Sequence, residues 1–429
     1  MAIVQPFRGV VYNPIRVDYE AITCPPYDVV NPTLHQSLYD RHPQNAIRLE
    51  LPMEENRYDI AAERWTQWRQ QQVLLTDERP AIYLYDQTFT TKDGKEVTRK
   101  GFIARLKTEP FSAQVVMPHE RTLPKAKSDR LNLFRKTAAN FSPIFVLYRD
   151  PSLSLDEWMS ETRDDLPFME VVDYQGTTNR IWRLKNAAVL DRIQAYFTDQ
   201  KLYIADGHHR YETALAYAEE RASANPAHTG SEAYNFVMAY FTNMDDPDLV
   251  VYPTHRLVHS LPVPVITSLA GRLEEAFAVY EFGSENDLKG FIRQRKTGRF
   301  GLVQPAKGET LRFSGLEFRG DFSHFEDQNL PTDLKELDVS VLHQIILRKY
   351  LGITQEAQDM QTNLIYSKDW DESVGMIRNG KAEMAFLMNP TPVSSVVNVC
   401  NSGHVMPQKS TFFYPKVITG IVFHDLNGR

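Results

Sequence analysis

The segment 201–221 changes its hydrophobic period within a few residues, and this change constrains the fold more than any other part of the chain. It begins with the short apolar run LYIA, which is typical of a buried strand. After an Asp-Gly pair, apolar residues return at i, i+4 and i+7, at Tyr211, Leu215 and Ala218. This spacing places them on one face of a helix. The segment therefore predicts a strand, a tight turn and a helix.

Strand and helix patterns interleave along the rest of the chain. Asp93 and Gly94 separate two runs with a period near two, which predicts a β-hairpin. The segment 234–244 predicts a long strand with 249–258 as its neighbour, and the segment 417–424 predicts a closing strand. Because strands and helices do not alternate strictly, we expect a mixed α/β chain of the α+β class.

Composition and charge exclude several classes of protein. The formal net charge is -7, so no overall basic field favours nucleic acid as a partner. No window reaches the roughly 20 apolar residues of a membrane span, and the first residues lack the pattern of a signal peptide. Cys24 and Cys400 lie far apart without metal-ligand spacing, and we interpret both as buried, inert thiols. We expect a cytoplasmic protein without a membrane partner.

The turn within 201–221 concentrates polar chemistry. Asp206 is predicted to be the helix N-cap, and Gly207 permits a close approach of the backbone. The first amides of the helix, the positive end of its dipole and the side chains of His208, His209 and Arg210 would together favour an anion. These first-turn side chains are expected to contribute little to the core, so substituting Arg210 or His209 should leave the fold intact.

Asp206 complicates the anion site, because a carboxylate beside a phosphate repels it. The repulsion is avoided if a cation lies between the two groups or if the carboxylate faces a hydroxyl. Asp206 therefore indicates either a Mg²⁺ ligand or a catalytic base. The alternative is that Asp206 only caps the helix and that the histidines lie on its solvated face.

Two further segments carry the same kinds of side chain. The segment 117–134 supplies the acidic and basic residues His119, Glu120, Arg121, Lys125, Lys127, Asp129 and Arg130. The segment 404–416 supplies Lys409, Ser410 and Thr411, followed by Lys416. Hydroxyls beside a lysine suit oxyanion binding, but a solvated charged face and a surface turn are the alternatives. The Pro-rich loop CPPYDVVNP is expected to be rigid, and its Tyr27 and Asp28 are candidate substrate ligands.

Several motifs, taken in order, identify a family resemblance. They are PFRGVVYNP, CPPYDVVNP, NAIRLELP, MPHERT with KSDRLNLF, NFSPIFVLY, IADGHHRYETAL and MPQKSTFFYPK. They look like the bacterial and archaeal family called domain of unknown function 1015, a name that carries no activity. The Asp-Gly-His-His-Arg motif is also similar to that of free serine kinases in the ParB and sulfiredoxin superfamily, which phosphorylate L-serine with ADP, ATP or pyrophosphate.

The resemblance implies a ParB/sulfiredoxin-like core elaborated with additional sheets and helices. It implies a phosphate-binding core at 1–260, an α/β insertion at 261–335 and a C-terminal segment at 336–429 that returns to the active site. The residues from Asp206 to Arg210 would hold the phosphoryl donor, with Mg²⁺ on Asp206. Lys409, Ser410 and Thr411 would also bind phosphate, whereas His119, Arg121, Asp129 and Arg130 would contact the substrate. Such kinases use a separate glutamate as base, and Glu120 is the candidate here.

The function expected from this resemblance is phosphoryl transfer to a small hydroxylated metabolite, with L-serine as the expected acceptor, or the reverse reaction from O-phosphoserine. The chain has no glycine-rich nucleotide loop, which favours pyrophosphate over ADP or ATP as donor. A phosphatase that uses the same site is a near variant. A non-catalytic sensor of a phosphorylated metabolite and a ParB-like DNA-associated protein are the alternatives, although no basic helix pair follows Arg221. A homodimer is compatible with the sequence.

Overall fold

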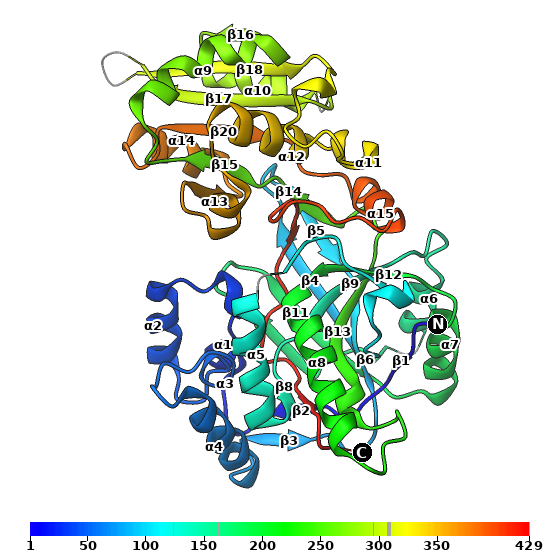
Figure 1. Ribbon diagram of the computed structural model, residues 1–429. Helices are drawn as coiled ribbons and strands as arrows, with labels where there is room; N and C mark the ends of the chain where they lie inside the picture. Colours follow the sequence, from blue (N-terminus) through cyan, green and yellow to red (C-terminus); the bar gives the residue numbers. More distant parts are fainter. Residues whose placement is uncertain (123, 162, 295, 307–309, 429) are drawn as a thin grey trace. The chain divides into compact units, whose positions relative to one another are not determined.

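A computed structural model describes residues 1–122, 124–161, 163–294, 296–306 and 310–428. The chain divides into two compact units, and each is described by itself. Unit 1 comprises Met1–Pro118, Thr122–Val250 and Pro415–Arg429, and unit 2 comprises His119–Arg121 and Val251–Tyr414. Both units combine sheets with helices, which confirms the predicted mixed class (Figure 1). The functional division at 260/261 and 335/336 stays a prediction.

Unit 1 is built on a ten-stranded mixed sheet. Its main path runs in the order β10 (Met169–Val172), β11 (Thr178–Leu184), β4 (Ile82–Thr90), β6 (Phe102–Lys107), β13 (Phe236–Asn243), β9 (Ile144–Tyr148), β12 (Leu202–Asp206) and β7 (Val116–Met117). β1 (Val4–Gln5) pairs with β6, and β5 (Glu96–Arg99) pairs with β4. The predicted hairpin at Asp93 and Gly94 joins β4 to β5, and Gly94 has the positive φ that this turn needs.

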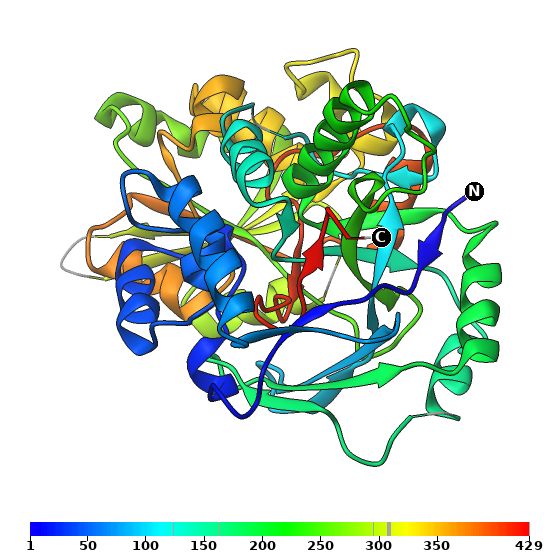
Figure 2. The ribbon, with the colours of Figure 1, turned by 90° about the horizontal axis from the view of Figure 1, so that it is seen from below.

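Helices pack on this sheet through its alternating apolar positions. α5 (Pro124–Thr137) and α8 (His208–Ala224) lie side by side, as Figures 1 and 2 both show, and α8 contacts β9 and β13. Phe102 and Phe241 stack in the core with ring centroids 4.9 Å apart. The remaining helices of the unit are α1 (Tyr19–Ile22), η1 (Tyr27–Val29), α2 (Pro32–Arg41), α3 (Ile47–Glu50), α4 (Arg57–Gln70), η2 (Phe111–Ala113), α6 (Ser154–Ser160), α7 (Ala187–Phe197) and η3 (Ala233–Asn235). None of the helices in the described part of the chain is both long and apolar enough to span a bilayer.

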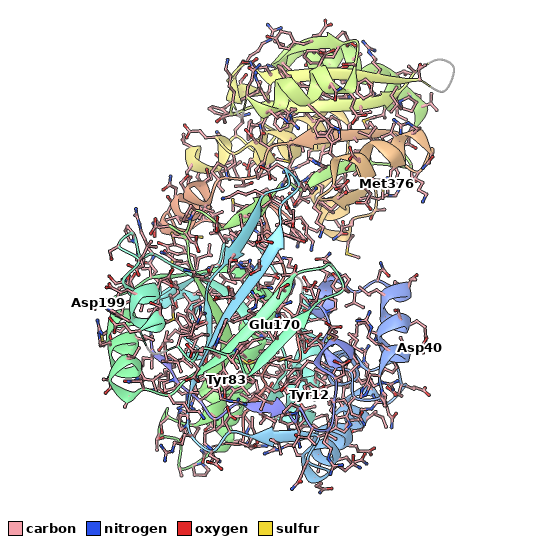
Figure 3. All side chains as sticks on the ribbon, turned by 180° about the vertical axis from the view of Figure 1, so that it is seen from behind. Tyr12, Asp40, Tyr83, Glu170, Asp199 and Met376 are labelled. Atoms are coloured by element: carbon pink, nitrogen blue, oxygen red, sulfur yellow. The ribbon has the colours of Figure 1, made fainter. Side chains whose placement is uncertain are left out.

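The N-terminal segment is fixed against the sheet by close packing at Gly9. Tyr83 of β4, labelled in Figure 3, accepts a hydrogen bond from the Gly9 amide at 2.8 Å and donates one to Asp77 at 2.7 Å. A Cβ at position 9 would lie 2.3 Å from the Tyr83 hydroxyl, so only glycine fits there. Two short pairs complete the unit: β2 (Val10–Tyr12) with β3 (Leu74–Thr76), and β8 (Ala139–Asn140) with β22 (His424–Asp425).

The last residues of the chain run through unit 1 as an irregular segment. Thr419 exchanges backbone hydrogen bonds with Cys24, and Phe423 does so with Val10. The prediction of a strand over 417–424 is therefore wrong for most of its length, since only β22 pairs regularly. The apolar residues of this segment are buried, but its backbone pairs with the rest of the unit through isolated β-bridges and not through a continuous ladder.

Unit 2 contains a six-stranded antiparallel sheet. Its order is β16 (Phe277–Phe282), β18 (Leu311–Phe318), β17 (Arg299–Pro305), β20 (Met384–Met388), β15 (His255–Val258) and β19 (Leu364–Ser367). Its helices are α9 (Val263–Ala276), α10 (Glu285–Arg293), η4 (Phe322–His324), α11 (Thr332–Lys335), α12 (Asp338–Val341), the π-helix η5 (Leu342–Tyr350), α13 (Gln355–Met360), α14 (Trp370–Arg378), which carries the Met376 labelled in Figure 3, and α15 (Val393–Asn401). The short strands β14 (Val250–Tyr252) and β21 (Phe412–Tyr414) pair with each other.

The segment 249–258 corrects a second prediction. It does not continue beside β13, because Pro253 separates β14 from β15 and β15 pairs with β19 and β20. An alternating apolar run fits any sheet with a buried face, so the sequence pattern does not identify the sheet that the strand joins.

We expect Asp338→Asn to stabilise the protein at neutral pH. Burial raises the pKa of Asp338 from 3.8 to about 6, against the lowering effect of the Gly298 amide, which donates to its carboxylate at 2.6 Å. The folded state therefore holds this proton between pH about 4 and 6 while the unfolded state releases it, so stability falls as pH rises through that window. The asparagine keeps an acceptor for Gly298 and removes the buried charge. Urea unfolding should show a gain of about 2–3 kcal/mol at most above pH about 6 and none below about 4. A gain that does not depend on pH would contradict this account.

Candidate functional site

The turn after β12 is set by Gly207. This glycine has φ of 87° and is the N-cap of α8. Asp206 is the last residue of β12, and its Oδ1 accepts the Gly207 amide at 2.9 Å. The prediction that Asp206 is the N-cap is therefore wrong, because the left-handed turn at Gly207 moves the helix start forward by one residue. This hydrogen bond holds the Asp206 carboxylate at the end of the strand.

Lys416 supplies a cation to Asp206. Its Nζ lies 3.1 Å from Asp206 Oδ2, and the two side chains are 13% and 18% exposed. Its backbone carbonyl accepts from Gln87 at 3.1 Å, and the Pro415 carbonyl accepts from the buried Arg99 at 2.8 Å. The irregular C-terminal segment is thus anchored on β4 and β5, which fixes where the lysine side chain starts.

Arg210 is a second cation beside Asp206. Its guanidinium lies 3.7 Å from Asp206 Oδ2, is 5% exposed and donates to the carbonyl of Pro143. Burial acts to lower the pKa of Arg210, but Asp206 and the neighbouring Asp28, Tyr27 and Glu50 outweigh it and the pKa is raised. The expectation that first-turn side chains add little to the core is wrong here. Arg210 is buried, and its guanidinium is held by the Pro143 carbonyl and the Asp206 carboxylate.

The two histidines of the turn are also buried, but to different degrees. His208 is only 7% exposed, and His209 is half-buried. The interpretation of both histidines as part of a solvated face is therefore wrong for His208 and incomplete for His209.

Tyr27 and Arg130 extend the cluster within unit 1. The Arg130 guanidinium lies 4.4 Å from the centroid of the Tyr27 ring and donates to both the carbonyl and the carboxylate of Glu50, at 2.7 and 3.2 Å. Ser142 donates to the same carboxylate at 3.1 Å. Burial, partly offset by Arg210 and Arg130, raises the pKa of Tyr27 to about 12. Tyr27 is thus a neutral hydrogen-bonding group at neutral pH.

Asp129 closes the outer side of this cluster. It pairs with Arg130 at 2.6 Å and with Arg57 at 2.6 Å, and it accepts from Tyr58 at 2.7 Å. Burial alone would raise the pKa of Asp129, but Arg130 and these partners lower it. Asp129 and Arg130 therefore hold each other. Asp28 of the Pro-rich loop is exposed, and its charge is one of those that raise the pKa of Arg210.

The second group of predicted residues lies in unit 2. The Met406 amide donates to the His119 carbonyl at 2.8 Å, and the Ser410 amide donates to Glu120 Oε1 at 2.9 Å. His119 Nε2 lies 2.9 Å from the Thr411 hydroxyl. The structure thus brings His119 and Glu120 together with the loop 407–411, in which Lys409 is exposed and has φ of 57°. Arg121 is exposed, and the side chain of Lys125 lies outside the described residues.

Arg256 supports this loop and was missed by the sequence reasoning. It is fully buried and donates to the carbonyls of Thr254 and Lys409, the latter at 3.0 Å. Its Nε lies 3.2 Å from His343 Nε2, and His343 Nδ1 lies 2.8 Å from Gln358 Oε1, so the imidazole accepts from Arg256 and donates to Gln358. Burial lowers the pKa of Arg256 to about 10. The sequence feature that could have identified Arg256 is an arginine within an apolar strand pattern.

The charges of the unit 1 cluster nearly balance. Lys416, Arg210 and Arg130 face the carboxylates of Asp206, Glu50 and Asp129, with Asp28 and Arg57 at the periphery. Within the turn itself the sequence shows Asp206 as the carboxylate, whereas Glu50, Asp129 and Asp28 come from segments far away in sequence. An anion that enters the cluster would therefore have to share these cations with the carboxylates.

The described residues do not fit a protein-held Mg²⁺. Among them, no group of three or more His, Cys, Asp or Glu gathers as metal ligands. Asp206 Oδ2 is in contact with Lys416, so an ammonium lies where a metal ion would approach this oxygen. Mg²⁺ on Asp206 stays a prediction.

Comparison of the chain with known protein families gives a match. The family described as "Protein of unknown function (DUF1015)" matches residues 4–340, which is most of the chain. The chain belongs to the DUF1015 family. The resemblance predicted from its motifs is thereby confirmed, and no curated protein matches this DUF1015 chain.

Solved structures give only distant likenesses to the DUF1015 chain. A conserved hypothetical protein from Pyrococcus furiosus is 12% identical, with 73% of this chain and 90% of that chain covered and a TM-score of 0.36. A free serine kinase in complex with AMP is 13% identical, with 73% and 86% covered and a TM-score of 0.36. SbnI with a C-terminal truncation, from Staphylococcus aureus, is 8% identical, with 75% and 86% covered and a TM-score of 0.36. At these scores the likenesses carry no argument about the function of this chain.

Proposed function

We propose that this DUF1015 protein is a kinase-like phosphotransferase acting on a small hydroxylated metabolite. The observation that carries the proposal is the arrangement of Lys416, Asp206 and Arg210 at the strand-to-helix turn. A carboxylate held between an ammonium and a guanidinium supplies both a proton acceptor and two cations for phosphoryl oxygens. The similarity of the Asp206–Arg210 motif to that of free serine kinases points to the same chemistry.

In the proposed reaction the acceptor hydroxyl attacks the terminal phosphorus of the donor. A new O–P bond forms, the bond from phosphorus to the leaving phosphate oxygen breaks, and the hydroxyl proton passes to the Asp206 carboxylate. Lys416 and Arg210 neutralise the charge that develops on the phosphoryl oxygens, and the amides of α8 add the positive end of its dipole. Phosphoryl transfer needs mainly positioning and charge neutralisation, which fixed side chains of this kind provide.

The finer assignments belong to this proposal. L-serine is the proposed acceptor, and pyrophosphate, ADP or ATP is the proposed donor. The ParB/sulfiredoxin-like core at 1–260, the insertion at 261–335, the returning segment at 336–429, the cytoplasmic location and the homodimer remain parts of the same hypothesis. Gly207, His208 and His209 are proposed donor ligands with Arg210, and Tyr27 and Asp28 are proposed substrate ligands.

A non-catalytic phosphometabolite sensor is the second candidate. It is favoured by one observation: every cation of the unit 1 cluster already has a carboxylate partner, so the cluster is stable without a reacting group. A ParB-like DNA-associated protein has no comparable support in these contacts. Turnover separates the first two candidates.

Phosphorus NMR tests the proposal. Purified protein is incubated with L-serine and, in parallel, with pyrophosphate, ATP or ADP, each with and without Mg²⁺. We expect a phosphoserine resonance with one donor and its loss in Asp206→Asn, which keeps the shape of the side chain but removes the proton acceptor. If no donor gives a phosphoserine or inorganic phosphate signal while pyrophosphate still raises the melting temperature, the sensor is the better account.

Glu120→Gln tests the predicted base role of Glu120. A base role predicts that turnover falls by about 100-fold or more while donor affinity stays unchanged. Glu120 accepts the Ser410 amide, and glutamine retains an acceptor oxygen for that bond, so loop 407–411 should keep its conformation. Activity equal to that of the parent would leave Asp206 as the base and Glu120 as a support of the loop.

A further inference from the structure

Unit 2 contains a cavity of about 470 Å³ that the proposed phosphoryl transfer does not use. It lies among the end of β18, η4, α11, α12 and α15. Pockets that bind small molecules commonly measure about 300–1,000 Å³ and combine apolar walls with a few polar groups. The lining residues that matter here are Phe318, Phe322, Asp333, Glu336, Ser395 and Asn398. Its size and mixed lining are those of a small-molecule site.

Asp333 carries an incompletely compensated charge at this cavity. Its Oδ2 is buried and has no hydrogen-bond partner within the described ranges, and its Oδ1 lies 3.9 Å from His404 Nε2. A buried carboxylate oxygen without a donor is costly and uncommon in folded proteins. Oδ2 is buried away from the cavity, whereas the Asp333 side chain as a whole is 27% exposed and lines it. The terminal torsion of an aspartate is broad, so a donor in the cavity meets Oδ1 directly or Oδ2 after a rotation of the carboxylate.

The other charges on the lining strengthen the negative field. Glu336 adds a second carboxylate on an exposed side chain. Lys335 also lines the cavity, but its ammonium donates to the Gln328 carbonyl at 2.9 Å. Two carboxylates and one lysine give the lining a net negative charge, which favours a cation and disfavours an anion.

Aromatic rings supply the apolar part of the lining. Phe318 and Phe322 are half-buried, with ring centroids 5.7 Å apart and planes inclined at 48°. Such rings accept an organic body by van der Waals contact and attract a cation to their faces. Ser395 and Asn398 of α15 add hydrogen-bonding groups.

We propose that this cavity binds a small organic cation, a protonated amine that carries an aromatic or aliphatic body. Its ammonium donates to Asp333, its body packs against Phe318 and Phe322, and a polar substituent reaches Ser395 or Asn398. The site is contained in unit 2 and does not depend on the phosphotransferase proposal.

The test compares two probes of similar size and opposite charge, 2-phenylethylamine and 3-phenylpropionate. Saturation-transfer NMR and calorimetry on the full chain should show binding of the amine at millimolar concentration or below and none of the carboxylate. Asp333→Asn should weaken amine binding by about tenfold or more, because it removes a charge-assisted hydrogen bond. The control is Asp371→Asn, which removes the same charge from a side chain that is 83% exposed and pairs with Lys289.

Phe322→Leu is a second variant that retains every charge, and it should also weaken binding of 2-phenylethylamine. The proposal is overturned if the parent binds no amine, if 3-phenylpropionate binds as well as the amine, or if Asp333→Asn and Asp371→Asn bind it equally. Phosphoryl-transfer activity has no part in these outcomes, so they are independent of the proposed function.

Discussion

Arg210→Met is expected to lower the free energy of unfolding by about 3–5 kcal/mol. The substitution removes a guanidinium that is 5% exposed and leaves the Pro143 carbonyl without this donor. It also leaves Asp206, Asp28 and Glu50 with one fewer cation in a partly desolvated cluster, and uncompensated buried charge is costly. Methionine fills a similar volume, so the loss reports the charge and its hydrogen bonds rather than a cavity.

Urea unfolding measures this effect, and Arg221→Met on the same helix is the matched control. Arg221 lies on the exposed side of α8, where it contacts Tyr217 at 3.3 Å and lies over the rings of Tyr217 and Tyr234. Its replacement should cost about 1 kcal/mol or less. Equal costs for the two variants would mean that the cluster around Asp206 tolerates the loss of a charge, contrary to our account.

Local patterns were sufficient to predict the elements whose causes are local. The strand, turn and helix around Gly207 follow from a change of hydrophobic period within one segment, and the hairpin at Asp93 and Gly94 follows from its turn chemistry. The predicted neighbour of segment 249–258 was wrong, because its pattern fits any half-buried sheet. The strands that β15 pairs with, β19 and β20, lie more than 100 residues further along the chain. The strand predicted over 417–424 was wrong for most of its length, because a buried segment without a regular β-ladder also has an apolar sequence.

The candidate site shows the same division between local and distant causes. The sequence identified His119, Glu120 and the loop 407–411 as related in chemistry, and the structure brings them together in unit 2. It did not reveal that Arg210 is buried, because burial is set by the strands and helices around the turn and not by the turn itself. The charge balance was inaccessible for the same reason, since Glu50 and Lys416 reach the cluster from distant segments.

Lys416→Met is expected to weaken pyrophosphate binding by about 30- to 150-fold, the effect of losing one charge-assisted contact of about 2–3 kcal/mol. Lys416 Nζ lies 3.1 Å from Asp206 Oδ2, and its removal leaves the carboxylate to repel an incoming phosphate more strongly. Arg210 still lies 3.7 Å from the same oxygen, so the free energy of unfolding should change much less than in Arg210→Met. Lys416→Arg should recover part of the affinity, because the charge is retained but the fork of the guanidinium cannot reproduce the position of a single ammonium.

Calorimetry with pyrophosphate measures the affinities, and Lys136→Met is the control. Lys136 is also a unit 1 lysine paired with a carboxylate, Asp59 at 2.6 Å, but it is 54% exposed and lies at the end of α5. If both lysine variants bind pyrophosphate as the parent does, Lys416 only neutralises Asp206 and the phosphate must be held elsewhere. If the loss is confined to Lys416→Met, the C-terminal segment contributes a ligand to the phosphoryl donor. The irregular course of that segment through unit 1 would then have a function, because a lysine 210 residues after Asp206 in sequence reaches it only by that route.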